Sequence, residues 1–306
     1  MTGPGLIAAL DAQTVADAVG LGAVYALMAV GIGLVFGVLR LINFAYGQLV
    51  MAGAYTLAFT SDWPVAASIA ACFVVVIALS LAMERAVFRP LRTQSPAVML
   101  VTTFAVAFFL QSVALLIDIG DDTIGEPAAS VASLNQAIDV GGVDVRKITI
   151  VAVVTAVVAL SLLAILLART SIGLHMRAAA ADFQTARLVG VRANTVIGFA
   201  VLLSGVLAAT VAVILTVQFP LVSPDFALRD TIVVLVGVIV GGIDRLWTAT
   251  LGGFTIGFAS GIINGALPTD ETVFLPSAVF ALVILVLLLR PAGLFARGPS
   301  SGVERV

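Results

Sequence analysis

Charged and metal-binding side chains are scarce in this chain of 306 residues. Charged residues make up 10% of the sequence, which holds one cysteine, Cys72, and one histidine, His175. A single cysteine excludes an intrachain disulfide bond, and a single histidine excludes the paired-histidine zinc motifs and argues against a metal site. We therefore expect no metal ion, no cofactor and no catalytic residues.

Lysine is almost absent, and Lys147 is the only one. A Walker loop needs a lysine directly after a glycine to reach the nucleotide phosphates, and no Gly-Lys pair occurs. If the protein depends on ATP, we expect hydrolysis on a separate subunit. The chain itself is predicted not to be an enzyme.

Long apolar runs make up most of the remaining sequence, and hydrophobic residues reach 61%. About 20 apolar residues cross the hydrocarbon layer, and in lipid only helices satisfy their backbone groups within one segment. We expect an all-α polytopic bundle that forms a single transmembrane domain over residues 1–306, with eight or nine spans. The predicted spans cover residues 18–38, 43–60, 64–83, 97–117, 148–168, 195–217, 231–243, 249–267 and 273–289. The seventh is short enough to be a half-helix or a re-entrant segment.

The charged residues alternate between the connectors. Arginines gather in every second connector and in the C-terminal tail, whereas acidic residues gather in the others. By the positive-inside rule, the arginine-rich face is cytoplasmic. With nine crossings, this bias predicts an N-terminus outside and a C-terminus in the cytoplasm.

The longest outer connector covers residues 118–147 and is acidic. Gly125, Pro127 and the pair Gly141-Gly142 interrupt any long helix there. It is either a docking site for a soluble partner or a solvated connector.

The longest inner connector, residues 169–194, has the signals of a short helix. Its alanines favour helix, Thr170 or Ser171 can cap the start, and Gly190 stands where a helix would end. We expect one amphipathic helix that either inserts into a groove of another protein or serves as a solvated connector. Apolar residues recur along it at spacings of three and four, namely Met176, Ala179, Phe183, Ala186 and Val189 or Gly190.

Glycines recur at helical spacing in two of the spans. Residues four apart form one smooth stripe along a helix, and small side chains allow another backbone to approach closely. These stripes either pack within the chain, or some of them meet a second subunit or slide during gating. The predicted packing glycines are Gly33 and Gly37 in the first span and Gly253, Gly257, Gly261 and Gly265 in the eighth.

Amide side chains also occur inside spans or at their ends. An unpaired amide in hydrocarbon is costly, so such groups usually face a cavity or a neighbouring helix. They are candidates for the lining of a translocation pathway, with interhelical hydrogen bonding as the alternative. The four residues are Asn43, Gln48, Gln111 and Asn264.

Several motifs spread over the chain resemble the LivH-type permease subunits of ABC importers for branched-chain amino acids. They lie at both ends and in the middle, so the resemblance covers the whole chain. The motifs are Gly22-Ala-Val-Tyr-Ala-Leu27, Gly31-Ile-Gly-Leu-Val-Phe-Gly37, Leu39-Arg-Leu-Ile-Asn-Phe-Ala-Tyr-Gly-Gln48, Gly53-Ala-Tyr55, Arg177-Ala-Ala-Ala-Ala-Asp182, Ala186, Gly190-Val191, Gly241-Gly242 and Arg290-Pro-Ala-Gly-Leu-Phe295.

The resemblance implies an ATP-driven importer in a bacterial cytoplasmic (inner) membrane, with branched-chain amino acids or a related small polar solute as cargo. The implied partners are cytoplasmic ATP-binding subunits, a second permease subunit (alike or different), an extracytoplasmic solute-binding protein and membrane lipid, without nucleic acid. The inner connector would then contact the ATPase. The coupling residues that the resemblance implies are Arg177, Ala178, Ala179, Asp182, Ala186 and Gly190.

A secondary transporter driven by an ion gradient is the alternative. Such carriers tend to hold an ionisable residue at mid-membrane. Here the acidic residues stand at the ends of the predicted spans, and Asp118 is the nearest exception. The sequence therefore favours the ATP-driven importer.

Overall fold

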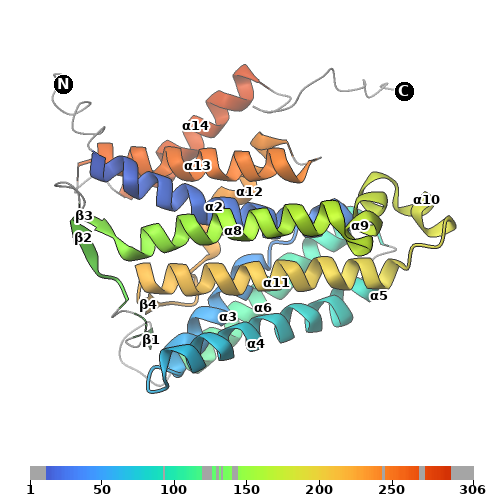
Figure 1. Ribbon diagram of the computed structural model, residues 1–306, viewed down its shortest axis with the longest axis horizontal. Helices are drawn as coiled ribbons and strands as arrows, with labels where there is room; N and C mark the ends of the chain where they lie inside the picture. The colour runs from blue at the N-terminus through green and yellow to red at the C-terminus, as the bar shows by residue number, and fades with distance from the viewer. Residues whose placement is uncertain are drawn as a thin grey trace.

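The computed structural model describes residues 12–91, 94–118, 126–128, 131, 134–139, 144–242, 245–268 and 273–290, and over this part of the chain the protein is a helical bundle, as predicted (Figure 1). Six helices are long and apolar enough to cross a membrane. They are α2 (Ala12–Leu39), α4 (Val65–Met83), α6 (Pro96–Asp118), α8 (Lys147–Arg169), α11 (Ala193–Gln218) and α13 (Leu246–Ala266).

Three shorter helices occupy the remaining predicted spans. They are α3 (Tyr46–Phe59), α12 (Leu228–Gly241) and α14 (Leu275–Leu289). At 1.5 Å per residue, the 14 residues of α12 reach only about 21 Å, less than the roughly 30 Å of a hydrocarbon core. The short seventh segment expected from the sequence is thus confirmed.

Helix α4 continues beyond Met83 through a π-helical turn, η1 (Glu84–Phe88), into α5 (Arg89–Leu91).

Helix α2 lies at the centre of the bundle. It contacts α8, α11, α12 and α13, and 83% of its most apolar window is buried. By contrast, only 17% of the corresponding windows of α6 and α8 is buried. The outer faces of these two helices are apolar and exposed, which is the pattern of a helix that contacts lipid.

The glycine stripe of α13 packs against α2. A Cβ atom added at any of its four glycines would collide with α2, so only glycine allows this approach. The stripe therefore packs within the chain, against α2. The facing residues on α2 are Tyr25 and Ala29 for Gly253, Leu21 and Gly22 for Gly257, Ala18 for Gly261, and Thr14 for Gly265.

The two predicted packing glycines of α2 differ from each other. A Cβ at Gly33 would lie 3.0 Å from the Leu246 side chain, so this glycine does pack against α13. A Cβ at Gly37 would meet no described atom within 4 Å. Gly37 is therefore not a packing glycine within the described part of the chain.

The described part of the outer connector contains short strands. Strand β1 (Glu126–Pro127) pairs antiparallel with β4 (Leu221–Val222), and β2 (Ala137–Asp139) pairs with β3 (Asp144–Arg146). The first pair joins the outer connector to the segment that precedes α12. The acidic positions 119–125 and the glycine pair lie outside the described residues.

Candidate functional site

The inner connector folds into two helices, so the prediction of one continuous helix is wrong. Helix α9 (Ser171–Ala181) ends at Asp182, whose extended backbone (φ −152°, ψ 107°) separates it from α10 (Phe183–Leu188). The Asp182 carboxylate accepts a hydrogen bond from the Thr185 backbone N–H at 3.1 Å and so caps α10. Aspartate is favoured at this position, because its short side chain accepts hydrogen bonds from free backbone N–H groups at the start of a helix.

The predicted start and end of the helical segment in this connector are correct. The Thr170 hydroxyl accepts a hydrogen bond from the Gly173 N–H at 3.1 Å, which caps α9. Gly190 has a φ of +91°, and the Val191 N–H donates to the Ala186 carbonyl at 3.0 Å. This glycine-based ending satisfies a carbonyl at the end of α10 that would otherwise lack a partner.

The small-residue stripe of this connector faces its own bundle. Met176, Ala179 and Ala186 are 3–4% exposed, and α9 contacts α2, α8 and α11. These buried side chains cannot insert into a groove of another protein, so that part of the prediction is wrong. Other side chains of the connector are exposed: Arg177 and Asp182 are exposed, and Leu174, Leu188 and Val189 are 57%, 87% and 75% exposed.

Arg40 joins this connector to the core, which the sequence did not indicate. It follows the end of α2 with a left-handed backbone (φ +54°), and its guanidinium donates a 2.6 Å hydrogen bond to the Ala180 carbonyl in the last turn of α9. Cationic donors are favourable at a helix C-terminus, where carbonyl groups lack intrahelical partners. This bond joins the last turn of α9 to the residue that follows α2.

The segment between α2 and α3 also contacts α6. The Thr103 hydroxyl donates to the Ile42 carbonyl at 3.3 Å, and the rings of Phe44 and Phe104 stack with centroids 3.9 Å apart. Asn43 is 2% exposed, and its side-chain oxygen accepts a 3.1 Å hydrogen bond from the Ala45 N–H. Asn43 thus shapes the turn and is not seen to line a pathway.

A cavity of about 110 Å³ lies between α3, α6 and α12 and brings together Gln48 and Gln111. Gln48 is 1% exposed, and its Oε1 atom has no hydrogen-bond partner among the described residues. The fourth predicted pathway residue, Asn264, is exposed near the end of α13 and does not reach this cavity. Apolar and hydroxyl groups complete the lining: Phe44, Phe104, Ala107, Phe108, Leu228, Thr231 and Ile232.

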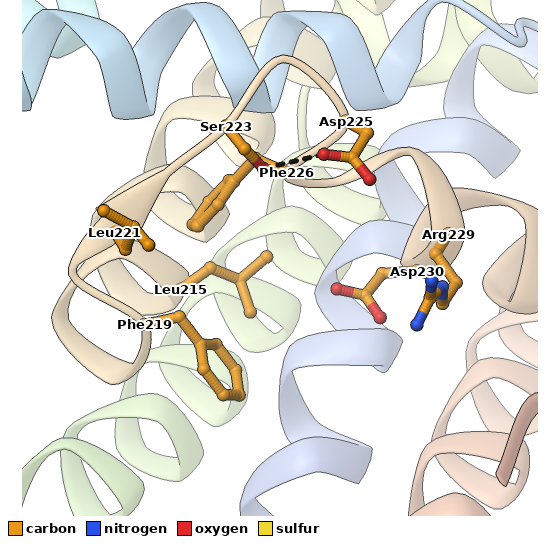
Figure 2. Close-up of a pocket in the computed structure, with 8 residues that line it drawn as sticks. All are labelled: Leu215, Phe219, Leu221, Ser223, Asp225, Phe226, Arg229 and Asp230. Atoms are coloured by element: carbon orange, nitrogen blue, oxygen red, sulfur yellow. Dashed lines mark hydrogen bonds between the residues drawn. The ribbon is translucent and has the colours of Figure 1, made fainter. Parts of the chain in front are cut away.

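A second, larger pocket of about 300 Å³ lies at the start of α12 (Figure 2). Arg229 and Asp230 come from the first turn of this helix, and Leu215 and Phe219 come from the end of α11 and the residue after it. The Tyr25 hydroxyl of α2 donates a 2.7 Å hydrogen bond to Asp230. No local pattern in the sequence indicates this pair, because the two residues are 205 positions apart.

The fold and these sites define a transport subunit embedded in a membrane: a bundle of apolar helices with two pockets and an exposed connector at one end. Residues 14–290 match the family described as branched-chain amino acid transport system / permease component, so the chain belongs to that family.

Individual relatives agree with this assignment. The chain is 28% identical over 300 residues to the high-affinity branched-chain amino acid transport system permease protein BraD of Pseudomonas aeruginosa, covering 93% of this chain and 95% of that protein. It is 28% identical over 302 residues to the corresponding protein LivH of Escherichia coli, again covering 93% and 95%.

Two solved structures share the fold. PsaBC from Streptococcus pneumoniae in complex with Fab has a TM-score of 0.53 at 12% identity, covering 90% of this chain and 91% of that one. A metal-chelate type ABC transporter in an inward-facing conformation has a TM-score of 0.52 at 18% identity, covering 91% and 86%. At these identities, the two likenesses support the architecture and not the cargo.

Proposed function

We propose that this permease imports branched-chain amino acids or a related small polar solute across a bacterial cytoplasmic membrane, driven by ATP hydrolysis on separate cytoplasmic subunits. The names of the relatives support the cargo. A second permease subunit would complete the membrane assembly, and an extracytoplasmic binding protein would deliver the solute. In this arrangement the N-terminus lies outside and α9 and α10 face the cytoplasm.

The surface formed by Leu174, Arg177, Leu188 and Val189 is the proposed contact with the ATPase. Exposed apolar side chains in an aqueous connector are a typical sign of an interface. Helix α9 packs on α2, α8 and α11 and buries Met176, and α10 contacts α9. A surface that is open to a partner and joined to the core through α9 is suited to transmitting force.

The transmission would use two states of the bundle. ATP binding brings the ATPase subunits together and displaces α9 and α10, and the Arg40 hydrogen bond passes this displacement to α2. A partner can shift such an equilibrium only if it binds the two states with different affinities. The contact at α9 and α10 must therefore differ between the outward-open and inward-open states.

Substitutions at the proposed contact test this function. In proteoliposomes that contain the full complex, we expect Leu188→Asp with Val189→Asp to lower ATP-driven uptake and solute-stimulated ATP hydrolysis at least about tenfold, the effect of losing roughly 1.4 kcal/mol of contact energy. Charge reversal at Arg177 tests the same surface with a different chemistry. Val273→Asp is the matched control. Val273 is 80% exposed and lies just before the start of α14, away from the proposed cytoplasmic face. Unchanged uptake and hydrolysis in the Leu188 and Val189 variant would contradict the coupling assignment.

The partly buried Asp230 supports a second candidate function. An acidic residue bonded to Tyr25 of the central helix α2 could couple transport to an ion gradient, as in secondary carriers. Uptake that persists after ATP depletion with the gradient intact would favour that carrier. Uptake that stops under these conditions would favour the ATP-driven importer.

A further inference from the structure

We propose that the pocket at the start of α12 receives the solute on the outer side of the permease, and that it binds an aliphatic α-amino acid as a zwitterion. Asp230 would accept hydrogen bonds from the ammonium group, Arg229 would bind the carboxylate, and the apolar part of the lining would contact the side chain. This inference rests on the proposed import function and its orientation. It adds a binding site and the residues that recognise the ligand.

The pocket lies at the end of the bundle opposite to the exposed connector. Strand β4, whose Leu221 lines the pocket, and helix α10 are at opposite ends of the molecule (Figure 1). With α9 and α10 facing the cytoplasm, the pocket is on the outer side, where a binding protein would deliver the solute. Its volume of about 300 Å³ is at the lower end of the range for small-molecule sites, roughly 300–1,000 Å³, and suits a ligand of amino-acid size.

One oxygen of the Asp230 carboxylate is open to the pocket. Its Oδ1 atom accepts the hydrogen bond from the Tyr25 hydroxyl, whereas its Oδ2 atom has no hydrogen-bond partner among the described residues. Oδ2 is also not one of the buried polar atoms that lack a partner, so solvent reaches it. A carboxylate that is held by a neighbour and has one oxygen open is suited to accepting a hydrogen bond from an ammonium group.

The Arg229 guanidinium lies beside this carboxylate. Figure 2 shows the two charged groups next to each other, with Leu215 and Phe219 across the pocket from them. Arg229 is exposed and forms no hydrogen bond or ion pair with any described residue. A guanidinium with free N–H groups binds a carboxylate through two parallel hydrogen bonds. Adjacent opposite charges therefore match an α-amino acid, whose ammonium and carboxylate groups are attached to the same carbon atom.

The remaining lining of the pocket is largely apolar. Leu215 is 1% exposed, whereas Phe219 and Leu221 are 57% and 59% exposed. An aliphatic side chain that covers these groups removes apolar surface from water, which favours binding. A second charged group on the ligand would instead be placed against apolar side chains, which is unfavourable.

The wall formed by β4 and the turn after it is held in place by hydrogen bonds. Strand β4 pairs with β1, and the Ala128 N–H donates to the Pro220 carbonyl at 2.8 Å. In the turn, the Ser223 hydroxyl donates to the Asp225 carboxylate at 2.7 Å, as the dashed line in Figure 2 shows. Since Asp225 serves this turn and is exposed, Asp230 is the better acceptor for a ligand inside the pocket.

Cysteine labelling of the wall tests the site separately from transport. In a Cys72→Ala background, Leu221→Cys places a thiol in the lining of the pocket. Ile138→Cys is the matched control, because Leu221 and Ile138 are 59% and 41% exposed in short strands of the same end, but Ile138 is not among the residues that line the pocket. The permease with its ATP-binding subunits is reconstituted in proteoliposomes and exposed to N-ethylmaleimide. The binding protein is left out of this measurement, since it would itself bind the amino acid.

We expect L-leucine at ten times its half-protecting concentration to slow alkylation of the Leu221→Cys variant about tenfold, as simple occupancy predicts. Alkylation of the Ile138→Cys variant should not change. Glycine keeps both charged groups and lacks the aliphatic side chain, so its half-protecting concentration should be at least about tenfold higher than that of leucine.

Two analogues of leucine separate the two ionic contacts. 4-Methylpentanoate lacks the ammonium group, and 3-methylbutylamine lacks the carboxylate. Asp230→Asn, which keeps an acceptor for Tyr25, should raise the half-protecting concentration of leucine about tenfold without raising that of 4-methylpentanoate. Arg229→Gln, at an exposed position, should raise the value for leucine about three- to tenfold without raising that of 3-methylbutylamine.

Leucine uptake by the same preparations, after addition of binding protein and ATP, separates the site from the import function. ATP-driven uptake without protection of the Leu221→Cys variant overturns the site and leaves the import function standing. Protection without ATP-driven uptake supports the site and overturns the proposed function. Equal protection of the Ile138→Cys variant overturns the site as well.

The analogues decide the role of each charged residue. If Asp230→Asn weakens protection by leucine and by 4-methylpentanoate to the same extent, Asp230 does not bind the ammonium group. If Arg229→Gln weakens protection by leucine and by 3-methylbutylamine equally, Arg229 does not bind the carboxylate. An unchanged half-protecting concentration of leucine in either variant overturns the assignment of that residue.

Discussion

The Arg40 guanidinium and the Ala180 carbonyl form a 2.6 Å hydrogen bond between residues 140 positions apart. Arg40 ends the most buried helix of the bundle, and Ala180 belongs to the last turn of α9, which presents the exposed connector. This bond therefore joins the helix that presents part of the proposed ATPase contact to the end of the central helix α2.

Removing the guanidinium should uncouple transport from ATP hydrolysis. Arg40→Gly suits this test, because glycine adopts the φ of +54° without strain. Loss of this solvent-exposed hydrogen bond, about 0.5–1.5 kcal/mol, predicts about a two- to tenfold fall in uptake per ATP hydrolysed. Arg40→Lys, which keeps the charge, should retain part of the coupling. An Arg40→Gly complex with the wild-type ratio of uptake to hydrolysis would refute the link.

Asp182 is expected to act as a helix cap rather than as a charge. Asp182→Asn keeps a capping oxygen for the Thr185 N–H, whereas Asp182→Ala removes it, a loss of about 0.5–2 kcal/mol in local helix stability. Uptake by the Asn variant should stay close to wild type, and uptake by the Ala variant should fall. Equal loss in both variants would indicate that the ATPase reads the negative charge itself.

The contact between α2 and α13 should be sensitive to a single methyl group. A Cβ at Gly257 would lie 2.8 Å from the Gly22 Cα and 2.9 Å from the Leu21 carbonyl oxygen, so we expect Gly257→Ala to destabilise the protein by about 1–3 kcal/mol. Gly37→Ala is the control, since its Cβ would meet no described atom and replacing a helical glycine adds about 0.5–1 kcal/mol of stability. Thermal unfolding of the two purified variants measures both effects, and a stable Gly257→Ala protein would argue against this packing.

The bond between Tyr25 and Asp230 should stabilise the start of α12 against α2. Tyr25→Phe leaves the partly buried carboxyl group without its donor, which we expect to cost about 0.5–1.5 kcal/mol. Asp230→Asn keeps an acceptor and should have a smaller effect. Chemical denaturation of the two variants compares them, and a Tyr25→Phe protein as stable as wild type would show that the bond contributes little.

The sequence predicted the nine helical segments well, because length and apolarity in a membrane protein are local properties of the chain. The predicted span 148–168 corresponds to α8 at Lys147–Arg169, and 195–217 corresponds to α11 at Ala193–Gln218. The break at Asp182 was missed, since its capping bond competes with a helix that the surrounding alanines favour. Periodicity showed that Ala179 and Ala186 share a face, but it could not show that this face is turned toward the bundle.

The candidate pathway residues were only partly predictable for a related reason. An amide in an apolar segment signals a polar contact without saying where the contact is. Asn43 bonds the nearby Ala45 backbone, and Asn264 reaches the surface, whereas Gln48 and Gln111 meet at a cavity formed by three helices. That meeting depends on tertiary packing, which a single sequence does not encode in any local pattern.

Uptake of radiolabelled leucine by proteoliposomes, with and without the ATP-binding subunits, tests the central claim most directly. The account predicts that the permease with its ATP-binding subunits, its binding protein and ATP accumulates leucine against a gradient. It also predicts that the permease alone does not, whatever ion gradient is imposed. Uphill transport by the purified permease in the absence of any ATP-binding subunit would contradict it.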